Sequence, residues 1–568
     1  MSALRPPGLG PLIGHTTHNT CRLWIQAGDP EDKPGGLAAN RRTIGVLGVV
    51  SDDGKKVEPA YYFRLQREFD RTGTFVLGKD VALGRHESDG VAPAKRGKPM
   101  VLRPDRPYRV RMATLTIDDP MPDEESLDDA ALAKFLPLID NIAPTLLDLA
   151  ADQCEVTIHT FPSPGKAQDA LSFLIGSCRY PGMLWKVKEA DRIFAPMVNH
   201  FDGSDKAPRF TLMVGDQIYA DTLNRFVPIG LADTYEEFQE RYRTAFSSPN
   251  MRRLLRAAPN YMILDDHEIE DNWSQDRLRD GGKHQLFNLA IGAYMSYQWS
   301  HGPRTFGRRL YYQFECGGYP FFVLDTRTQR FRDDAAGLRD NHLLGRPAID
   351  PANPSQLGLL LDWLAKQQQS RGNAPKFIVT ASVFCPNAMD ERLDPSGMAS
   401  GDALYDANTK RREASDSWPA YPETRQAILN EIVQRKIQNV VFLSGDIHCS
   451  NIARLDFEIG GNDAGIVAYD VTSSAFYWPF PFADGDPNNY VHDSRKSGQH
   501  DTFPVDGGTM NYRAWAFTQE DNFCRVDIDK AGSALEVRYF DRDGKAVKVS
   551  DDKGKPVSVN ALPLTPWT

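Results

Sequence analysis

Four short motifs of this chain are rich in side chains that bind metal ions or transfer protons. They are Gly176-Ser177-Cys178-Arg179, Gly215-Asp216-Gln217-Ile218-Tyr219, Asp265-Asp266-His267-Glu268 and Gly445-Asp446-Ile447-His448. Together they supply a thiol, several carboxylates, a phenol and two imidazoles, which are common metal donors in proteins. The pattern therefore predicts a metal centre assembled from four separate places in the chain.

An apolar run precedes each motif, at positions 171–175, 210–214, 261–264 and 440–443. Short apolar runs punctuated by Gly or Asp are typical of buried strands. In open α/β sheets the ligand site lies beyond the carboxyl ends of such strands. We therefore expect the four motifs to converge on one edge of one sheet.

Two of the motifs place their donors in a way that suits a pair of cations. Asp216 follows a glycine at a predicted strand end, so its two carboxylate oxygens can bridge two ions. Tyr219 reaches the same side if a helical turn begins there; the alternative is a surface phenol beside a cap formed by Asp221. Asp446 and His448 are two positions apart, so both side chains point the same way in an extended segment.

The acidic tetrad adds proton-transfer chemistry. Asp265 and Asp266 are adjacent acids at a strand end, and burying both is costly without cations or hydrogen-bond donors. The neighbouring His267 can give a proton to a leaving alkoxide. Asn272 either assists there or starts a helix, and an ordinary acidic helix start is the alternative interpretation of the whole tetrad.

Cys178 has two chemical interpretations. As a thiolate it binds a metal, and together with a phenol it suits ferric iron better than magnesium or calcium. As a phosphatase nucleophile it needs an arginine six residues later to close a phosphate loop, but position 184 is Leu. The nucleophile interpretation is thereby excluded, and a buried inert thiol remains the alternative.

Length and charge narrow the class of protein. A chain of 568 residues is too long for one compact core, so two or three domains are expected. A hydrophobic content of 41% and a charged content of 25% are ordinary for a soluble globular protein. The formal net charge of −10 argues against general nucleic-acid binding and leaves room for a local pocket that binds a small phosphate ester.

The cysteines and the N-terminus bear on the compartment. Seven irregularly spaced cysteines with no CxxC pair favour reduced thiols over a disulfide framework. The first residues lack the apolar core of a signal peptide, and no apolar run reaches the length of a membrane span. We expect a cytoplasmic protein, or a periplasmic or secreted one if an export signal has been removed.

The elements that position the motifs divide the chain into two parts. Residues 1–165 are expected to form an all-β sandwich domain, with a helical insertion near 126–150 in which Ser126 caps the helix toward Asp129. Its predicted strands are 20–27, with one buried face, then 43–50, 61–66, 74–77, 108–117 and 155–161. Two prolines and a glycine at 162–165 predict the boundary.

Residues 168–568 are expected to form an α/β catalytic domain of mixed sheets flanked by helices, closed by a β tail. The predicted helices are 235–258 and 356–369, and the further predicted strands are 320–324, 376–380, 523–528, 534–540 and 545–549. An aromatic and proline-rich segment at 474–485 follows the last motif. It either packs as a plain loop or offers aromatic faces to the organic group of a substrate.

The four motifs, taken together and in this order, resemble the PhoD-type alkaline phosphatases, a branch of the calcineurin-like metallophosphoesterases. Leu324-Asp325-Thr326-Arg327 also resembles a block of that family, and the segment from Gly10 resembles the start of its N-terminal sandwich. The resemblance covers most of the chain and is weakest at 120–165 and 385–425. It implies the metallophosphoesterase fold, with a sandwich domain before the catalytic one.

The resemblance also implies a binuclear site. One ion, expected to be Fe3+, would be held by Cys178, Tyr219 and His448, with Asp216 bridging. The second ion, expected to be Ca2+, would be held by Asp266 and Asp446. Mn2+, Zn2+ and Mg2+ are the alternatives for either place.

The remaining site residues follow from the same comparison of motifs. His267 would be the catalytic acid or a donor to a phosphate oxygen. Arg179 is assigned to catalysis and substrate binding, and Arg327 and Asn272 to substrate binding. The pair Asp325–Arg327 is equally consistent with a structural ion pair.

We therefore expect metal-dependent hydrolysis of phosphoric esters through a metal-bound hydroxide, most simply by an alkaline phosphomonoesterase of PhoD type. The alternatives are a phosphodiesterase or a phosphotriester-tolerant hydrolase on the same core, and a catalytically silent, metal-stabilised binding protein. The partner is a small-molecule phosphate ester, and neither nucleic acid nor a membrane span is expected. The oligomeric state is left open.

Overall fold

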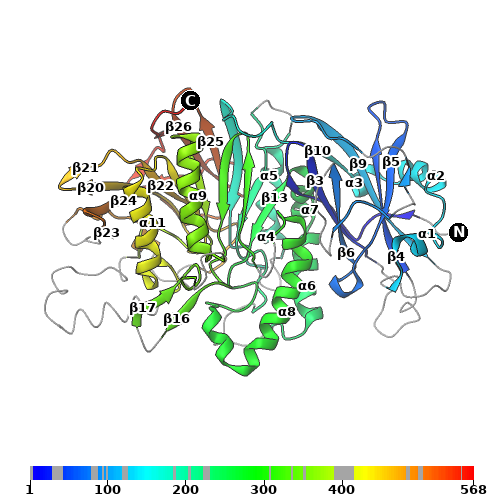
Figure 1. Cartoon of the computed structure of the whole chain (residues 1–568), viewed down its shortest axis with the longest axis horizontal. Helices are drawn as coiled ribbons and strands as arrows, with labels where there is room; N and C mark the ends of the chain where they lie inside the picture. The colour runs from blue at the N-terminus through cyan, green and yellow to red at the C-terminus, as the bar shows by residue number, and fades with distance from the viewer. Residues whose placement is uncertain are drawn as a thin grey trace.

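The structure is a computed structural model of the whole chain. The N-terminal strands and the C-terminal sheet lie toward opposite ends of its longest axis (Figure 1). It describes residues 4–28, 42–78, 87–91, 95–96, 100–117, 126–182, 187–202, 206–221, 230–305, 309–333, 337–348, 353–388, 415–480, 487–496, 503–551 and 553–568. The second half of the predicted aromatic segment, from position 481 to 485, lies outside these residues.

The N-terminal part contains two sheets. The first has the order β2 (Leu9–Thr16), β3 (Thr20–Gln26), β6 (Thr72–Gly78) and β7 (Glu87–Ser88). The second has the order β1 (Leu4–Arg5), β9 (Pro107–Ile117), β4 (Arg42–Val50), β5 (Val57–Phe63) and β8 (Lys95–Arg96), with β10 (Glu155–His159) paired to β9. Phe63, Phe75 and Val110 belong to one buried cluster drawn from both sheets, so apolar packing joins them.

The helical insertion is broken into short pieces. These are α1 (Asp129–Ala133), α2 (Ile139–Ile142), the 3-10 turn η4 (Ala143–Asp148) and α3 (Ala151–Cys154). The expected cap at Ser126 is wrong, because the carboxylate of Asp128 caps α1 by accepting from the backbone N–H of Ala131 at 2.7 Å. The helix ends four residues before Pro137, consistent with the limit that a proline sets on helix length.

The first sheet of the C-terminal part carries three of the four motifs. Its order is β13 (Asn260–Ile263), β12 (Thr211–Val214), β11 (Ala170–Gly176), β25 (Asn522–Asp529), β26 (Ala534–Asp541) and β29 (Leu562–Pro563). Strands β11, β12 and β13 are parallel, so their carboxyl ends lie at one edge. The C-terminal strand β25 pairs antiparallel with β11 and with β26, so two strands of the predicted β tail belong to this sheet. The strand predicted at 545–549 is wrong, because residues 545–548 form no strand and Val549 begins β27 (Val549–Ser550), which pairs with β24 (Gly508–Thr518) of the second sheet.

The second sheet carries the fourth motif, at the end of β19. Its order is β14 (Tyr312–Cys316), β15 (Tyr319–Val323), β18 (Lys376–Val379), β19 (Val440–Ser444), β22 (Ala468–Thr472), β20 (Ser450–Ile459), β24 (Gly508–Thr518), β27 (Val549–Ser550) and β28 (Pro556–Val557). Strand β21 (Asn462–Asp463) pairs with β20, β23 (Phe503–Val505) pairs with β24, and β16 (Phe331–Asp333) pairs with β17 (Gly337–His342). The expectation of one sheet edge is therefore corrected to the matching edges of two sheets.

The two sheets share an aromatic core. The ring of Phe173 on β11 lies 5.5 Å from both Phe321 on β15 and Phe377 on β18, and it stacks on Phe210 at 5.2 Å. Such ring pairs add to the free energy gained by burying the apolar surface itself. This core holds the carboxyl edges of the two sheets in a fixed relation, and that relation places the motifs.

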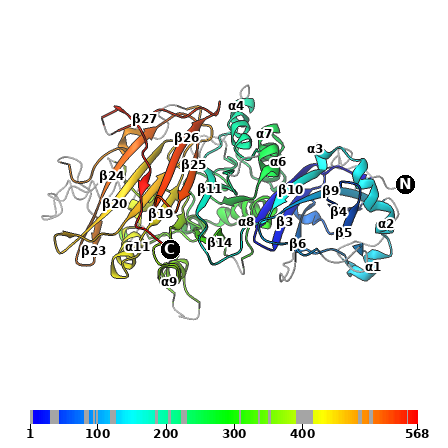
Figure 2. The ribbon, with the colours of Figure 1, turned by 90° about the horizontal axis from the view of Figure 1, so that it is seen from above.

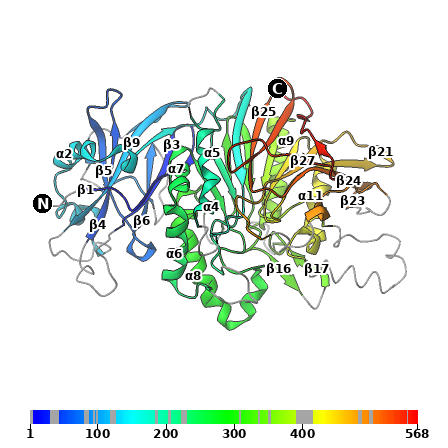
Figure 3. The same cartoon turned by 180° about the vertical axis from the view of Figure 1, so that it is seen from behind.

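Helices cover the outer faces of both sheets. The first sheet is covered by α5 (Phe194–Asn199), α6 (Tyr235–Ser247), α7 (Pro249–Ala257) and α8 (Gly281–Tyr297), and α4 (Val187–Arg192) packs against α5 and α7. The second sheet is covered by α9 (Gln356–Arg371) and α11 (Pro422–Gln434). The view from above separates α9 and α11 from α4, α6 and α7 (Figure 2), and the view from behind shows α4, α5 and α7 in front of the strands (Figure 3).

Two helix predictions differ in detail from the structure. The predicted helix at 235–258 is two helices, α6 and α7, because Ser248 is extended and Pro249 begins the second one. Thr234 and Glu237 form a capping box at the start of α6. The helix predicted at 356–369 extends to Arg371.

The cysteines and the helices carry two further findings. All seven cysteines are free and buried in the structure. Among the residues that the structure describes, no helix combines the length and the apolar character needed to cross a membrane.

Strand β3 is buried on both faces, although its alternating sequence predicts one buried face. Trp24, on the face predicted to be polar, is 1% exposed. Its indole N–H donates to the backbone oxygen of Ser296 at 2.9 Å, and its ring lies 5.6 Å from Tyr297, both on α8. The second face is buried because the N-terminal sheet packs against the helices of the C-terminal part.

We expect Trp24→Ala to weaken this packing between the two parts. The loss of a fully buried indole and its hydrogen bond should lower the free energy of unfolding by about 3–5 kcal/mol. Denaturant titration measures the change, and faster proteolysis at the 162–168 linker would report the loosened contact. Leu138→Ala is the control, because Leu138 is 74% exposed; equal stability of the two variants would contradict this role for Trp24.

Candidate metal centre

Two glycines allow the motif loops to approach closely at the sheet edges. Gly215 after β12 has φ = +89°, and a Cβ there would lie 2.5 Å from the Cβ of Asp265. A Cβ on Gly445 after β19 would lie 2.5 Å from the hydroxyl oxygen of Ser177. Both distances are far inside van der Waals contact, so only glycine fits at these two points. The glycines thus bring the four motifs together.

Four of the predicted ligands have a left-handed backbone. The φ angles are 57° for Cys178, 56° for Asp216, 75° for Asp446 and 53° for His448. This region disfavours residues with a Cβ and costs on the order of 1 kcal/mol or more for each one. Such outliers cluster at functional sites, where the surrounding structure holds them in place. Here they turn the side chains of three loops toward one another.

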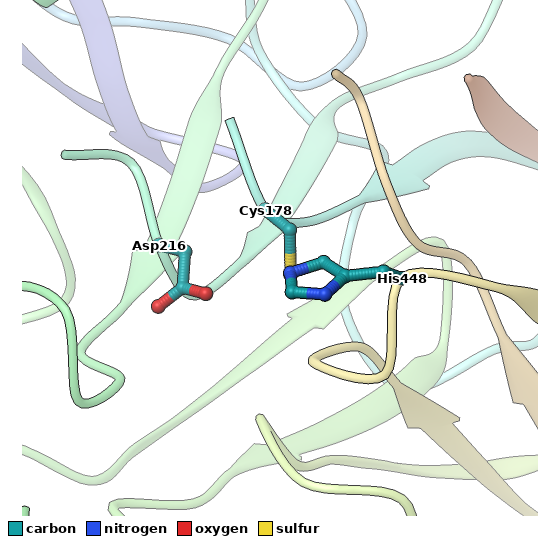
Figure 4. A group of neighbouring side chains, drawn as sticks. All are labelled: Cys178, Asp216 and His448. Atoms are coloured by element: carbon teal, nitrogen blue, oxygen red, sulfur yellow. The ribbon is translucent and has the colours of Figure 1, made fainter. Parts of the chain in front are cut away.

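The first group of donors is Cys178, Asp216 and His448, whose ligand atoms all lie within 4.8 Å of one another. Figure 4 shows the three side chains directed into one space from three separate loops. The phenol of Tyr219 donates to Oδ2 of Asp216 at 3.2 Å. A thiol, an imidazole and a carboxylate, with a phenol beside them, are therefore gathered at one point.

The second group consists of carboxylates. Oxygens of Asp216, Asp265, Asp266 and Asp446 all lie within 4.8 Å of one another. Asp216 belongs to both groups, as expected of a bridging ligand. Asp265 was not among the predicted ligands.

Several buried oxygens of this group have no hydrogen-bond partner. They are Oδ1 of Asp216, Oδ2 of Asp265 and Oδ1 of Asp266. Burying a carboxylate oxygen without a partner costs several kcal/mol, and bound cations remove that cost. The donor set and its unpartnered oxygens fit metal ions.

The pKa shifts of three predicted ligands also fit a bound cation. Burial, reinforced by the neighbouring carboxylates Asp216 and Asp446, raises the pKa of the Cys178 thiol well above its usual range. Burial also raises the pKa of both Asp216 and Asp446 well above the usual range of a carboxyl. Metal ligands must be deprotonated, so a positive charge bound among these groups is what would return them to their anionic form.

Arg327 supplies positive charge from behind the carboxylates. Its side chain is 0% exposed, its Nε donates to Asp265, and its Nη1 donates to both oxygens of Asp416, at 2.8 and 2.9 Å. Its Nη2 lies 3.4 Å from Asp266 and 3.7 Å from Asp446. The suggested structural pairing with Asp325 takes another form, because Asp325 accepts from the backbone N–H of Arg327. Phosphate binding by Arg327 stays a prediction, while its contacts assign it to charge compensation.

His267 is held by Asp221. Its Nδ1 lies 2.8 and 2.9 Å from the two carboxylate oxygens, and Asp221 also accepts from the backbone N–H of Asp271 at 2.7 Å. Burial alone would lower the pKa of His267, but Asp221, Asp266 and Asp216 raise it well above its usual value. A ring nitrogen of His267 also lies within 4.8 Å of carboxylate oxygens of Asp216 and Asp266. The imidazole of His267 thus borders the carboxylate group, and these carboxylates favour its protonated form.

Glu268 ties two of the motif loops together. Its carboxylate accepts from the backbone N–H groups of Asp216 at 3.2 Å, Gln217 at 2.7 Å and Asp265 at 2.9 Å. It also accepts from the side chain of Gln298 at 3.1 Å. Burial raises the pKa of Glu268 to about 7. This carboxylate positions the loops after β12 and β13 and does not belong to either donor group.

The contacts of Arg179 and Asn272 are equally consistent with a role in packing. The Arg179 guanidinium donates to the hydroxyl of Ser248 at 2.7 Å and lies over the ring of Phe194 at 5.3 Å. The backbone N–H of Asn272 donates to Asp266 at 2.6 Å, and its side chain donates to Asp271. Their assignment to phosphate binding stays a prediction.

Sequence reasoning missed the contributions of Asp221, Asp265 and Asp416. Asp221 was interpreted as a helix cap, and its position five residues after Asp216 in one motif was the available signal. Asp265 directly precedes Asp266, a predicted ligand, and this adjacency in the sequence was the available signal for Asp265. Asp416 lies 89 positions from Arg327 and in no motif, so nothing in the sequence indicated it.

This chain is similar to proteins that are already known. A family model described as "PhoD-like phosphatase" matches residues 185–497, which include Asp216, Asp266, Asp446 and His448 but not Cys178. The chain belongs to the PhoD-like phosphatase family.

A curated relative and a solved structure agree with this family. "Alkaline phosphatase D" of Bacillus subtilis (strain 168) is 26% identical over 322 residues, which are 53% of this chain and 50% of the relative. The chain thus matches about half the length of that relative. A solved structure described as "Structure of PhoD" has a TM-score of 0.60 at 17% identity, and the match covers 98% of this chain and 93% of the other. At that identity the likeness shows a shared fold.

We expect Glu268→Gln to loosen the two loops that Glu268 joins. The new amide nitrogen would face a backbone N–H in place of an acceptor oxygen, which should cost about 1–3 kcal/mol locally. Hydrogen exchange should therefore become about tenfold faster at the amides of Asp216, Gln217 and Asp265. Glu240→Gln on the exposed side of α6 is the control, and unchanged exchange in the Glu268 variant would sink this role.

Proposed function

We propose that the chain is a metal-dependent hydrolase of phosphoric esters, with phosphomonoesters as its substrate class. The observation that carries the proposal is the meeting of Cys178, His448 and Asp216 with the other carboxylates at the edges of two sheets. Membership of the PhoD-like phosphatase family supports it, as does the name of the curated relative, an alkaline phosphatase. We further propose that residues 1–165 form the N-terminal sandwich domain and residues 168–568 the catalytic domain.

Two ions of different character suit the two donor groups. Cys178, Tyr219 and His448 offer sulfur, phenolate oxygen and nitrogen, a set that suits Fe3+. Asp266 and Asp446 offer oxygen alone, which suits Ca2+. Asp216 would be shared between the two, and Mn2+, Zn2+ and Mg2+ are the competing ions.

The chain's own residues prepare the reaction around those ions. When bound, the ions would supply Lewis-acid polarisation of the phosphoryl group and a lowered pKa for a water molecule. His267, held by Asp221, would deliver its proton to the oxygen of the departing alcohol. Arg179, Arg327 and Asn272 are the candidates for contacts to phosphate oxygens.

We expect Asp216→Asn to reduce hydrolysis of p-nitrophenyl phosphate by at least about a thousandfold, because one bridging charge is lost from both donor groups. The variant should keep its circular dichroism spectrum and bind less metal, measured by elemental analysis. Asp233→Asn, at an exposed position, is the matched control. Turnover of the variant at the wild-type rate would rule out the binuclear mechanism.

The same assay separates the alternatives. Wild-type protein loaded with iron and calcium should hydrolyse p-nitrophenyl phosphate faster than bis(p-nitrophenyl) phosphate, and a chelator should stop both reactions. A preference for the diester would replace the monoesterase with a phosphodiesterase. Absence of turnover in protein shown to carry its metals would favour the silent binding protein.

We expect Asp221→Asn to lower kcat about ten- to a hundredfold while leaving the metal content intact. The amide can still accept a hydrogen bond from His267, but it no longer stabilises the protonated ring. Steady-state kinetics with p-nitrophenyl phosphate measure the change, again with Asp233→Asn as the control. A kcat equal to that of the wild type would show that Asp221 only packs beside the ring.

A further inference from the structure

Three aromatic side chains form a cluster beside the metal centre, here called the aromatic wall: Tyr180, Trp478 and Phe480. The ring of Tyr180 lies 5.5 Å from Trp478 and 5.0 Å from Phe480, and Trp478 lies 5.2 Å from Phe480. Tyr180 is 3% exposed, whereas Trp478 and Phe480 are only partly buried. The wall thus has a packed base and a partly open face.

The wall contacts the donors of the site directly. Trp478 stacks on the imidazole of His448, with ring centres 3.5 Å apart and planes within 10°. Tyr180 lies 5.3 Å from Tyr219, whose ring in turn lies 4.2 Å from His267. The wall therefore contacts His448 directly and is connected to His267 through the ring of Tyr219.

The backbone of the wall is joined to the Cys178 loop. The backbone N–H of Phe476 donates to the backbone oxygen of Ser177 at 2.7 Å, and the backbone N–H of Tyr477 donates to the backbone oxygen of Cys178 at 3.2 Å. The backbone N–H of Trp478 donates to the carboxylate of Asp521 at 3.0 Å. Residues 476–478, which end at Trp478, are thus fixed relative to the Cys178 loop.

Packing alone does not account for the open face of the wall. The side chains of Tyr180 and Tyr477 pack in the interior and are only 3% and 4% exposed. Trp478 and Phe480 are only partly buried, and Trp478 lies against the donor His448, where a polar residue would be hydrated at lower cost. Partly open aromatic rings next to a polar site are what binds a flat organic group.

We propose that the aromatic wall binds the aromatic or otherwise planar organic group of the phosphate ester. This inference rests on the proposed function. In that proposal His267 gives its proton to the departing oxygen, so the alcohol would leave on the side of His267, which the ring of Tyr219 connects to the wall. The substrate class is thereby narrowed to phosphate esters of aryl, arylalkyl or similarly planar alcohols.

The test compares two esters that differ in ring character alone: benzyl phosphate and cyclohexylmethyl phosphate. Both release a primary alcohol, so the chemistry of bond cleavage is closely matched. The metal-loaded wild-type protein should show the higher kcat/KM with the benzyl ester. Phe480→Leu should lower kcat/KM for that ester roughly three- to tenfold and leave the cyclohexylmethyl ester within about twofold.

Two further variants separate the wall from the metal centre. Trp478→Phe keeps a ring to stack on His448 and should show a smaller loss, with the metal content unchanged. Phe135→Leu is the matched control, since Phe135 is exposed on the helical insertion. It should affect neither ester. Equal losses for both esters in Phe480→Leu, or equal wild-type kcat/KM for the two esters, would overturn the wall as a binding surface.

Binding of two non-reactive probes keeps this inference distinct from the proposed function. Calorimetry with benzylphosphonate and cyclohexylmethylphosphonate on the metal-loaded protein requires no turnover. Tighter binding of the benzyl probe, lost in Phe480→Leu, supports the wall even if neither ester is hydrolysed, in which case the hydrolase proposal fails alone. Hydrolysis of both esters without discrimination between the probes would leave the hydrolase standing and remove the wall.

Discussion

The burial of like charges in one small volume is the constraint on which the rest of this structure depends. Asp216, Asp265, Asp266 and Asp446 bring carboxylate oxygens within 4.8 Å of one another, where repulsion is strong because little water screens it. Arg327 offsets part of that repulsion from behind. The oxygens that remain without a partner fit bound cations.

The fold holds these carboxylates close together. The motif loops come from two sheets, which are locked together by the ring contacts of Phe173 with Phe321 and Phe377. Glu268 then joins the loops after β12 and β13 through their backbone N–H groups. Strain in the left-handed ligands is tolerated because these contacts over-determine the loops.

The aromatic wall lies against the metal centre. Because Trp478 stacks on His448 and its segment pairs with the Cys178 loop, the wall and the donors form one rigid unit. Family membership and donor chemistry support the proposed reaction, whereas the wall supports the proposed class of alcohol.

The sequence by itself determined the strands before the motifs, the helical segments at 235–258 and 356–369, the donor types and the family, because periodicity and residue type are local properties. Only the tertiary structure decided that the motifs meet between two sheets, that Asp221 holds His267, and that Asp416 pairs with Arg327 from 89 positions away. It also buried the second face of β3 through Trp24. The physical reason is that burial and the pairing of charges depend on distances between remote segments, and these distances exist only once the chain has packed.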